Sequence, residues 1–523
     1  MSSDPAPAAP GLSASDQADV VDAVSGLSAI MAGAARSLDL SSFPEPFQAS
    51  LLRLRADAPA ASDAQTSLGA LSAGEISAEE WVRDCLSRID AAPPGRLAWR
   101  DIEADAAIAR ARYLDRERLL GRARGPLHGV PVGMKDMFDR KGRRSTWGSP
   151  MREHAPVASE DATIVARLEA AGAIVLGSQH MAEFAMSPTG LNAAFGPGRN
   201  PWQVDHVSGG SSSGAGMSVG AGHVPLAIGS DTGGSVRLPA ALCGVAGLKP
   251  TQHRISVAGV MPLSPSLDCV GPLASSVDLC AWAFAAMAGP DPRDGSCLDI
   301  GICSGGFSAD AARRFVLAVP DLSGSDLVTD EMARAIADAR RALTAAGVRC
   351  IDVPGVDLDL TGRLGSIVLA AESAAIHRQW LADPSSGYGR QVRRRLSRGL
   401  FLRGMDYYDA LRLRGPLLQA FLRDAFRGAD AVLLPTVPGD APRVVDTMDR
   451  DEAVLEREFS RLSAWTRGIN YLGVPALNVR AGFSARGLPL GVQFVGRPLA
   501  EEVILGLGRL FQRSTDWHRR SPQ

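Results

Sequence analysis

The chain has 523 residues, with 55 Lys or Arg, 57 Asp or Glu, and a formal net charge of −2. This balance, without a basic stripe, argues against a protein that holds nucleic acid through phosphate contacts. A hydrophobic fraction of 46% and a charged fraction of 21% are typical of a globular protein and exclude a disordered or fibrous one.

Several bulk features predict where the protein works and what it lacks. No run of about 18 apolar residues is present, so we expect no membrane span. The chain has an acid but no base before Arg36, which is not the pattern of a secretory signal. Seven scattered cysteines without a CxxC pair indicate a cytoplasmic protein with reduced thiols. Because no HExxH or close histidine pair occurs, we expect no metal and no other cofactor.

Taken in chain order, the N-terminal part predicts a mobile tail and a helical extension. Residues 1–66 hold both, the tail over 1–16 and the helical pattern from about 20 to 55, and residues 67–520 are expected to form one domain. An amphipathic helix follows position 67, and another is predicted over 101–118.

The domain over 67–520 then alternates strands with helices. Apolar runs at 130–134 and 173–177 suit buried strands on either side of a helix over 162–172. Residues 328–425 are predicted to be mostly helical, and strands return at 431–434 and 489–495. This alternation predicts an α/β fold around a largely buried sheet.

Residues 204–240 form a serine- and glycine-rich stretch with two competing motif matches. Gly210 to Gly214 fits a GxSxG nucleophile elbow, and Gly214 to Gly220 nearly fits a dinucleotide fingerprint. Each motif requires a preceding buried strand, whereas the preceding PWQVDHVS is polar and turn-like. We therefore interpret both matches as accidental.

The chemistry of two other segments predicts a serine nucleophile. Asp231-Thr-Gly-Gly-Ser235 is a loop with small side chains that ends in a serine, so several amides can converge on one carbonyl oxygen. Lys135 ends an apolar run, and burial there would lower its pKa. A shift from about 10.4 to about 7.5 costs on the order of 4 kcal/mol. The lysine would gain a neutral amine that can accept a proton near neutral pH, which none of the 52 arginines could provide.

The segment GGSSSGAG…GSDTGGSVRLPAALCGVAGLKPT resembles the signature of the amidase signature family of serine hydrolases. Further stretches occur in family order: GPLHGVPVGMKDMFD, HMAEFAMSPTGLNAAFGPGRNPW, GVMPLSPSLDCVGPLA and NYLGVPALNV…GLPLGVQFVGRP. Together they cover roughly residues 67–520. The resemblance implies the α/β amidase signature fold, a large mixed central β-sheet covered by helices on both faces, preceded here by the N-terminal helical extension.

The resemblance also implies a Ser–Ser–Lys triad. Ser235 matches the acylated nucleophile, Ser211 matches the bridging serine that follows a cis peptide bond, and Lys135 matches the base. Ser212 and Ser213 remain alternatives to Ser211 as the proton relay.

Other site residues carried over by the resemblance support this triad. The implied oxyanion hole is the backbone of Thr232, Gly233, Gly234 and Ser235. The remaining supporting positions are Asp231, Arg237, Ser212 and Gly210. Phe184 and Met186 match a segment near the active site and are candidates for the pocket wall. Lys249 is expected to be structural, and Lys141 a surface charge.

The function implied is an amidohydrolase that cleaves a small amide, aryl amide, urea or carbamate through a seryl acyl-enzyme. With it we expect a small-molecule amide-like substrate, no nucleic-acid or membrane partner, and a homodimer. The alternative is the glutaminase (A) subunit of a tRNA-dependent amidotransferase, which shares the fold and triad. The helical extension favours the free-standing amidohydrolase. So do two departures from the family pattern: KPTQHR replaces a usual aromatic–Gly pair, and Ser275 stands where many members have Arg. A third alternative is a non-catalytic family member, which the intact triad disfavours.

Overall fold

A single mixed sheet organises the protein in the computed structural model, which describes residues 9–37, 76–91, 96–301, 310–447 and 452–522. Within these residues the sheet has 11 strands in the order β1-β3-β2-β4-β6-β5-β10-β11-β9-β7-β8. The strands are β1 Trp99–Ile102, β2 Pro131–Lys135, β3 Ile174–Gln179, β4 Leu226–Ser230, β5 Ala246–Lys249, β6 Val270–Ala274, β7 Val316–Pro320, β8 Arg349–Val353, β9 Ala431–Pro435, β10 Ala476–Phe483 and β11 Pro489–Gly496.

The sheet combines two parallel groups with an antiparallel centre. Strand β2 pairs in parallel with β3 and β4, and β7 pairs in parallel with β8 and β9. Between the two groups, β6, β5, β10 and β11 form antiparallel pairs. Every residue of β2, β4 and β9 is buried, as expected for strands covered on both faces.

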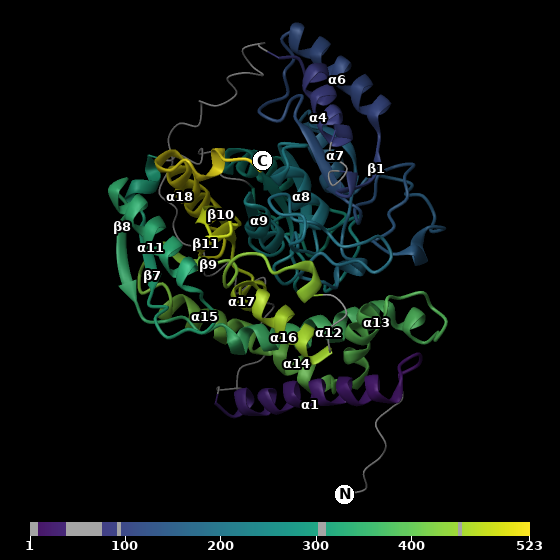
Figure 1. The fold of residues 1–523 in the computed structure, drawn as a ribbon, viewed down its shortest axis with the longest axis vertical. Coiled ribbons are helices and arrows are strands. Elements are labelled where there is room, and N and C mark those ends of the chain that lie inside the picture. The colour runs from purple at the N-terminus through teal and green to yellow at the C-terminus, as the bar shows by residue number, and fades with distance from the viewer. Residues whose placement is uncertain (1–8, 38–75, 92–95, 302–309, 448–451, 523) are drawn as a thin grey trace, which may run out of the picture.

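Helices cover both faces of the sheet (Figure 1). One layer consists of α4 Ala78–Ala91, α6 Ala104–Leu119, α8 Ser213–Gly220 and α9 Arg237–Cys243. The other consists of α7 Thr163–Ala170, α10 Val277–Met287, α11 Asp330–Ala345 and α18 Glu501–Ser514. Strand β4 shows the alternation: Ala227 packs in the first layer, and Leu226 and Ile228 pack in the second.

A further group of helices lies along one side of the molecule, with α1 across its outside (Figure 1). The group comprises α1 Ala14–Ser37, α12 Asp359–Leu381, α13 Arg390–Ser397, the short η4 Arg398–Phe401, α14 Gly404–Arg412, α15 Arg414–Asp424, α16 Glu452–Leu462 and α17 Ala464–Leu472. Much of this layer shares a separate apolar core that includes Met31, Leu364, Leu413 and Ile469.

The elements agree with the sequence-based predictions in most places. The four predicted strands are β2, β3, β9 and β11, each within two residues of its predicted limits. The predicted helix over 101–118 begins at Ala104, because positions 101 and 102 belong to β1. Strand β8 interrupts the region predicted to be mostly helical. Helix α1 begins inside the predicted tail, and the rest of the predicted extension, over 38–55, lies outside the described residues.

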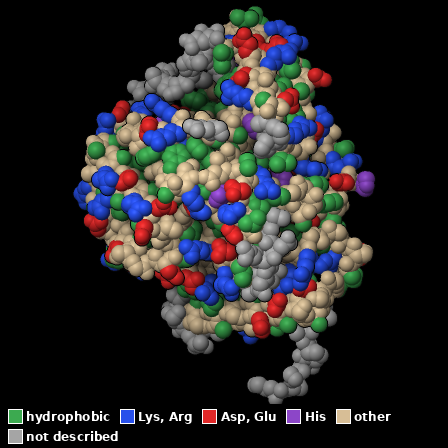
Figure 2. Space-filling view, in the orientation of Figure 1, with side chains coloured by type: hydrophobic (Ala, Val, Ile, Leu, Met, Phe, Trp, Pro, Cys, Tyr) green, Lys and Arg blue, Asp and Glu red, His purple; other side chains and the backbone are tan. Residues whose placement is uncertain are grey.

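The surface carries both signs of charge. Figure 2 shows basic and acidic side chains interspersed over one face, without a single-sign region. That face therefore offers no electrostatic pattern typical of phosphate binding. Of the helices in the described ranges, none is both long and apolar enough to span a bilayer.

Candidate active site

The ends of two neighbouring parallel strands bring the first polar groups together. Met134 of β2 lies opposite Ile228 of β4, so the last residues of these strands, Lys135 and Ser230, emerge at the same edge of the sheet. The Lys135 Nζ donates a hydrogen bond to the Ser230 hydroxyl at 2.8 Å. Ser230 was not among the predicted site residues.

Ser211 provides the second partner of this lysine. The Lys135 Nζ donates to the Ser211 Oγ, also at 2.8 Å. Ser211 follows a cis peptide bond to Gly210, and it is fully buried. A Cβ at position 210 would lie 2.6 Å from the Gly190 nitrogen, so only glycine fits there.

Burial determines the protonation of Lys135. Its side chain is only 1% exposed, and burial lowers its pKa from 10.5 to about 7, although the negative charges of Asp268 and Asp231 oppose this shift. The amine is therefore substantially neutral at physiological pH. A neutral amine can accept a proton from a hydroxyl that it contacts.

The DTGGS loop is folded around a buried ion pair. The Asp231 carboxylate accepts hydrogen bonds from the Gly234 amide at 2.7 Å and from the Arg237 Nε at 3.0 Å. Burial alone would raise the pKa of Asp231, but the Arg237 guanidinium beside it lowers that pKa to about 2. Arg237 also donates to Gln493 and Asn470, which fixes the loop to the centre of the sheet.

The loop presents candidate donors for a developing oxyanion. The Gly234 amide is committed to Asp231, whereas the amides of Thr232, Gly233 and Ser235 have no acceptor among the described residues. Ser235 is partly exposed. The Thr232 hydroxyl donates to Asp268 at 2.6 Å, and burial raises the pKa of that carboxyl to about 6. Asp268 was not singled out from the sequence.

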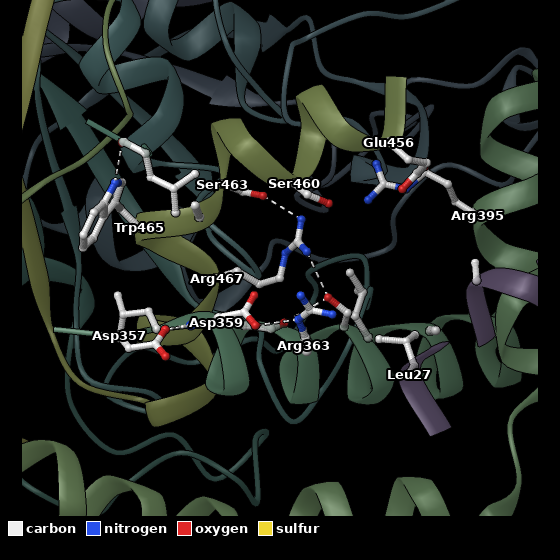
Figure 3. Close-up of a pocket in the computed structure, with 18 of the residues that line it drawn as sticks. Leu27, Asp357, Asp359, Arg363, Arg395, Glu456, Ser460, Ser463, Trp465 and Arg467 are labelled. Carbon is white, nitrogen blue, oxygen red and sulfur yellow. Dashed lines mark hydrogen bonds and ion pairs between the residues drawn. The ribbon is translucent and has the colours of Figure 1, made fainter. Parts of the chain in front are cut away.

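A cavity of about 560 Å³ is lined in part by residues of α17, the helix that adjoins this loop, whereas Lys135, Ser211 and Ser235 are not among its lining residues. Figure 3 shows the cavity. Its size is in the usual range for a small-molecule site. Helix α17 joins the two features: the Thr466 hydroxyl donates to the Gly233 carbonyl at 2.8 Å, and the next residue, Arg467, lines the cavity. Met186 lines it as well.

Two guanidinium groups in this cavity share one carboxylate, and a third lies beside them. Arg398 pairs with Glu456 at 2.9 Å, and the Arg395 Nε lies 3.8 Å from the same side chain. Arg467 instead donates to the hydroxyls of Ser463 and Ser366. Burial and the nearby Arg395 lower the pKa of Arg467 to about 10, so it remains charged at neutral pH. The lining as a whole holds four arginines and three carboxylates, Asp357, Asp359 and Glu456. Arg467, which contacts hydroxyls, is therefore the candidate partner for a negatively charged group of a substrate.

Among the other predicted site residues, Met186 lies at the cavity, whereas Phe184 and Ser212 do not. Met186 lines the cavity, but Phe184 lies in an aromatic cluster with Trp147 and His377. The Ser212 hydroxyl contacts the Ser230 backbone. Phe184 and Ser212 are therefore structural neighbours of the site.

The remaining two lysines differ in their relation to these contacts, since the charge of Lys249 helps to lower the pKa of Asp231. Lys249 is fully buried and donates to the Pro250 carbonyl at 2.8 Å, and Lys141 is exposed. No group of three or more His, Cys, Asp or Glu side chains that could hold a metal ion occurs in the described part of the chain.

Comparison with known proteins identifies the family. The family model Amidase matches residues 80–505. The chain belongs to the amidase signature family. It is an amidase, a hydrolase that acts on C–N bonds other than peptide bonds, and its central mixed sheet is that of amidase signature enzymes.

Three known proteins illustrate what this amidase is similar to in sequence and structure. A glutamyl-tRNA(Gln) amidotransferase subunit from Roseiflexus castenholzii is 36% identical over 478 residues, covering 87% of this chain and 96% of that protein. A chain from an unexpected vestigial protein complex, which reveals the evolutionary origins of an s-triazine catabolic enzyme, is 30% identical to this chain. Its TM-score is 0.76, and the match covers 86% of this chain and 97% of that one. The peptide amidase of Stenotrophomonas maltophilia is 27% identical with a TM-score of 0.73, covering 88% and 99%.

These relatives correct the partner prediction. The expectation of a small-molecule substrate, no nucleic acid and a homodimer is wrong, because the relatives at about 35% identity are subunits of an enzyme named for a tRNA substrate. The physical reason is that net charge describes this chain alone. A balanced charge does not exclude an assembly in which another protein chain contacts the RNA.

Proposed function

We propose that this amidase is the glutaminase (A) subunit of a glutamyl-tRNA(Gln) amidotransferase-type assembly and releases ammonia from glutamine. The observation that carries the proposal is the 36% identity over 96% of the length of the Roseiflexus protein. The cavity supports it, because Arg467, which donates to two hydroxyls there, offers positive charge to the carboxylate of glutamine. The described residues include six free cysteines, and free thiols are consistent with a protein that works in the cytoplasm.

In this proposal Lys135, Ser211 and Ser235 form the catalytic triad. Neutral Lys135 takes the Ser211 proton while Ser211 takes the proton of Ser235, and the Ser235 Oγ attacks the amide carbon of glutamine. The amides of the DTGGS loop, including those of Thr232 and Gly233, stabilise the oxyanion.

The second half of the reaction returns the proton. When the C–N bond breaks, the proton passes from Lys135 through Ser211 to the leaving nitrogen, so ammonia leaves rather than an amide anion. The acyl group stays on Ser235 as an ester. Water attacks that ester through the same relay, which gives glutamate and restores Ser235.

The test is ammonia release from glutamine with and without the other subunits of a glutamyl-tRNA(Gln) amidotransferase. We expect release to require those subunits and to be abolished by Ser235→Ala, with amidation of glutamyl-tRNA(Gln) in the complete assembly. Hydrolysis of an amide, urea or carbamate by the chain alone, with no glutamine turnover in the assembly, would instead support the free-standing amidohydrolase of the sequence analysis.

A further inference from the structure

The N-terminal helix α1 contributes directly to the cavity beside the DTGGS loop. Helix α1 precedes the segment matched by the family model, residues 80–505, yet Ala23 and Leu27 line the cavity. These residues are four positions apart and therefore lie on the same face of the helix. Figure 3 shows Leu27 on α1 at one side of the cavity and Arg395, next to Glu456, at another.

Apolar packing holds α1 in this position. Val24 and Met31 are 4% and 2% exposed, and Met31 belongs to the core that also contains Leu364 of α12 and Leu413. Helix α1 contacts α12, α13, α14 and η4, and Figure 1 shows it crossing the outside of this group. Its cavity-lining face is thus fixed against the helices that form the rest of the wall.

Polar contacts at two positions of α1, Asp16 and Ser28, also attach this helix to its neighbours. Asp16 pairs with Arg390 at 2.8 Å and with Arg394 at 2.5 Å, and Arg394 has only 4% of its side chain exposed. Further along the helix, the Ser28 hydroxyl donates to Asp406 at 2.8 Å. A buried arginine paired in this way resists displacement, because removing one partner leaves an uncompensated charge.

Helix α13 connects α1 to the charged part of the cavity. Consecutive residues of α13 point to different partners: Arg394 pairs with Asp16 of α1, and Arg395 donates to the Met186 carbonyl and faces Glu456. The position of α1 and the position of the cavity guanidinium groups are therefore set by the same short helix.

We propose that α1 is a wall of the substrate pocket, and that Ala23 and Leu27 limit the size of the group that a substrate places beside Arg395 and Arg467. The pocket favours a short chain with a negatively charged end, because its α1 residues Ala23 and Leu27 are apolar and its α17 residue Arg467 is cationic. Leu27 disfavours bulky aromatic groups. The inference rests on the proposed function, because it assumes that Ser235 is the nucleophile that attacks the bound substrate.

The experiment compares how fast a small and a large sulfonyl fluoride modify Ser235. The probes are methanesulfonyl fluoride and phenylmethanesulfonyl fluoride, and the readout is the ratio of their second-order rates, with the adduct located by mass spectrometry. Leu27→Ala enlarges the pocket, and Leu27→Trp fills it. Ala29→Trp is the matched control, since Ala29 is exposed on the same helix.

We expect Leu27→Trp to lower the ratio of the large to the small reagent by about tenfold and Leu27→Ala to raise it several-fold, in line with the selectivity of apolar pockets. Ala29→Trp should leave the ratio at the wild-type value. Equal ratios in all four proteins, with Ser235 modified in each, refute the role of α1 and leave the proposed function intact. Absence of modification at Ser235 in the wild-type protein refutes both.

Discussion

The burial of Lys135 makes a quantitative prediction about pH. Its pKa of about 7 lies about 3.5 units below the ordinary value of 10.5, which corresponds to about 5 kcal/mol of differential interaction between the two protonation states. Between pH 7 and pH 10.5 the unfolded chain holds a proton on this residue and the folded chain does not. The free energy of unfolding therefore rises with pH across this window.

Replacing the lysine with an apolar side chain of similar shape isolates this contribution. Lys135→Met removes the penalty for keeping a buried amine, so the variant should be the more stable protein near pH 7, offset in part by the two hydroxyls that lose their donor. The wild-type protein should gain about 4 kcal/mol relative to the variant between pH 7 and pH 10.

The assay is urea unfolding of both proteins at a series of pH values, with reversibility checked at each. Rates of Ser235 modification measured on the wild-type protein should rise with pH and reach half their maximum near pH 7. A stability difference that does not change with pH, or an active Lys135→Arg variant, would refute the neutral-amine account.

Three further predictions concern the end of β4, the loop that follows it and the start of α9. Gly234→Ala should lower the free energy of unfolding by about 2 kcal/mol or more, because φ at this position is +124° and the new Cβ would meet the Thr466 hydroxyl. Gly233→Ala should change the free energy of unfolding by less than about 1 kcal/mol, because its new Cβ would lie 3.8 Å from the nearest atom. Urea titration measures both changes. Arg237→Met should cost about 3–5 kcal/mol because it leaves a buried carboxylate unpaired, and an unchanged urea midpoint would contradict this. Ser230→Ala should slow the modification of Ser235 about fivefold through loss of one hydrogen bond to the amine, and a rate equal to wild type would show that this contact is dispensable.

Local chemistry made much of the site predictable. Lys135 ends an apolar run, which is the pattern of a buried strand, so its burial and lowered pKa follow from the sequence. The DTGGS segment predicts a tight loop, and Gly234 indeed has a positive φ. The sequence did not single out Ser230, because its contact with Lys135, 95 positions away, depends on the parallel pairing of β2 with β4.

Long-range assembly explains the other omissions. The cavity combines residues of α1, α12, α13, η4, α16 and α17, and no local periodicity shows which of these helices face one another. Strand β8 escaped prediction because RCIDV is partly polar and lies between helical, arginine-rich segments. The partner prediction failed for a related reason, since the surfaces that select partners are built from scattered residues and total charge does not describe them.

The account depends most directly on the identity of the nucleophile. Treatment with phenylmethanesulfonyl fluoride, digestion and mass spectrometry should locate one adduct on Ser235, formed rapidly in the wild-type protein and slowly or not at all in Lys135→Ala. An adduct on Ser211, Ser212 or another serine, or equal modification of Ser235 in the two proteins, would contradict the proposed Ser–Ser–Lys mechanism.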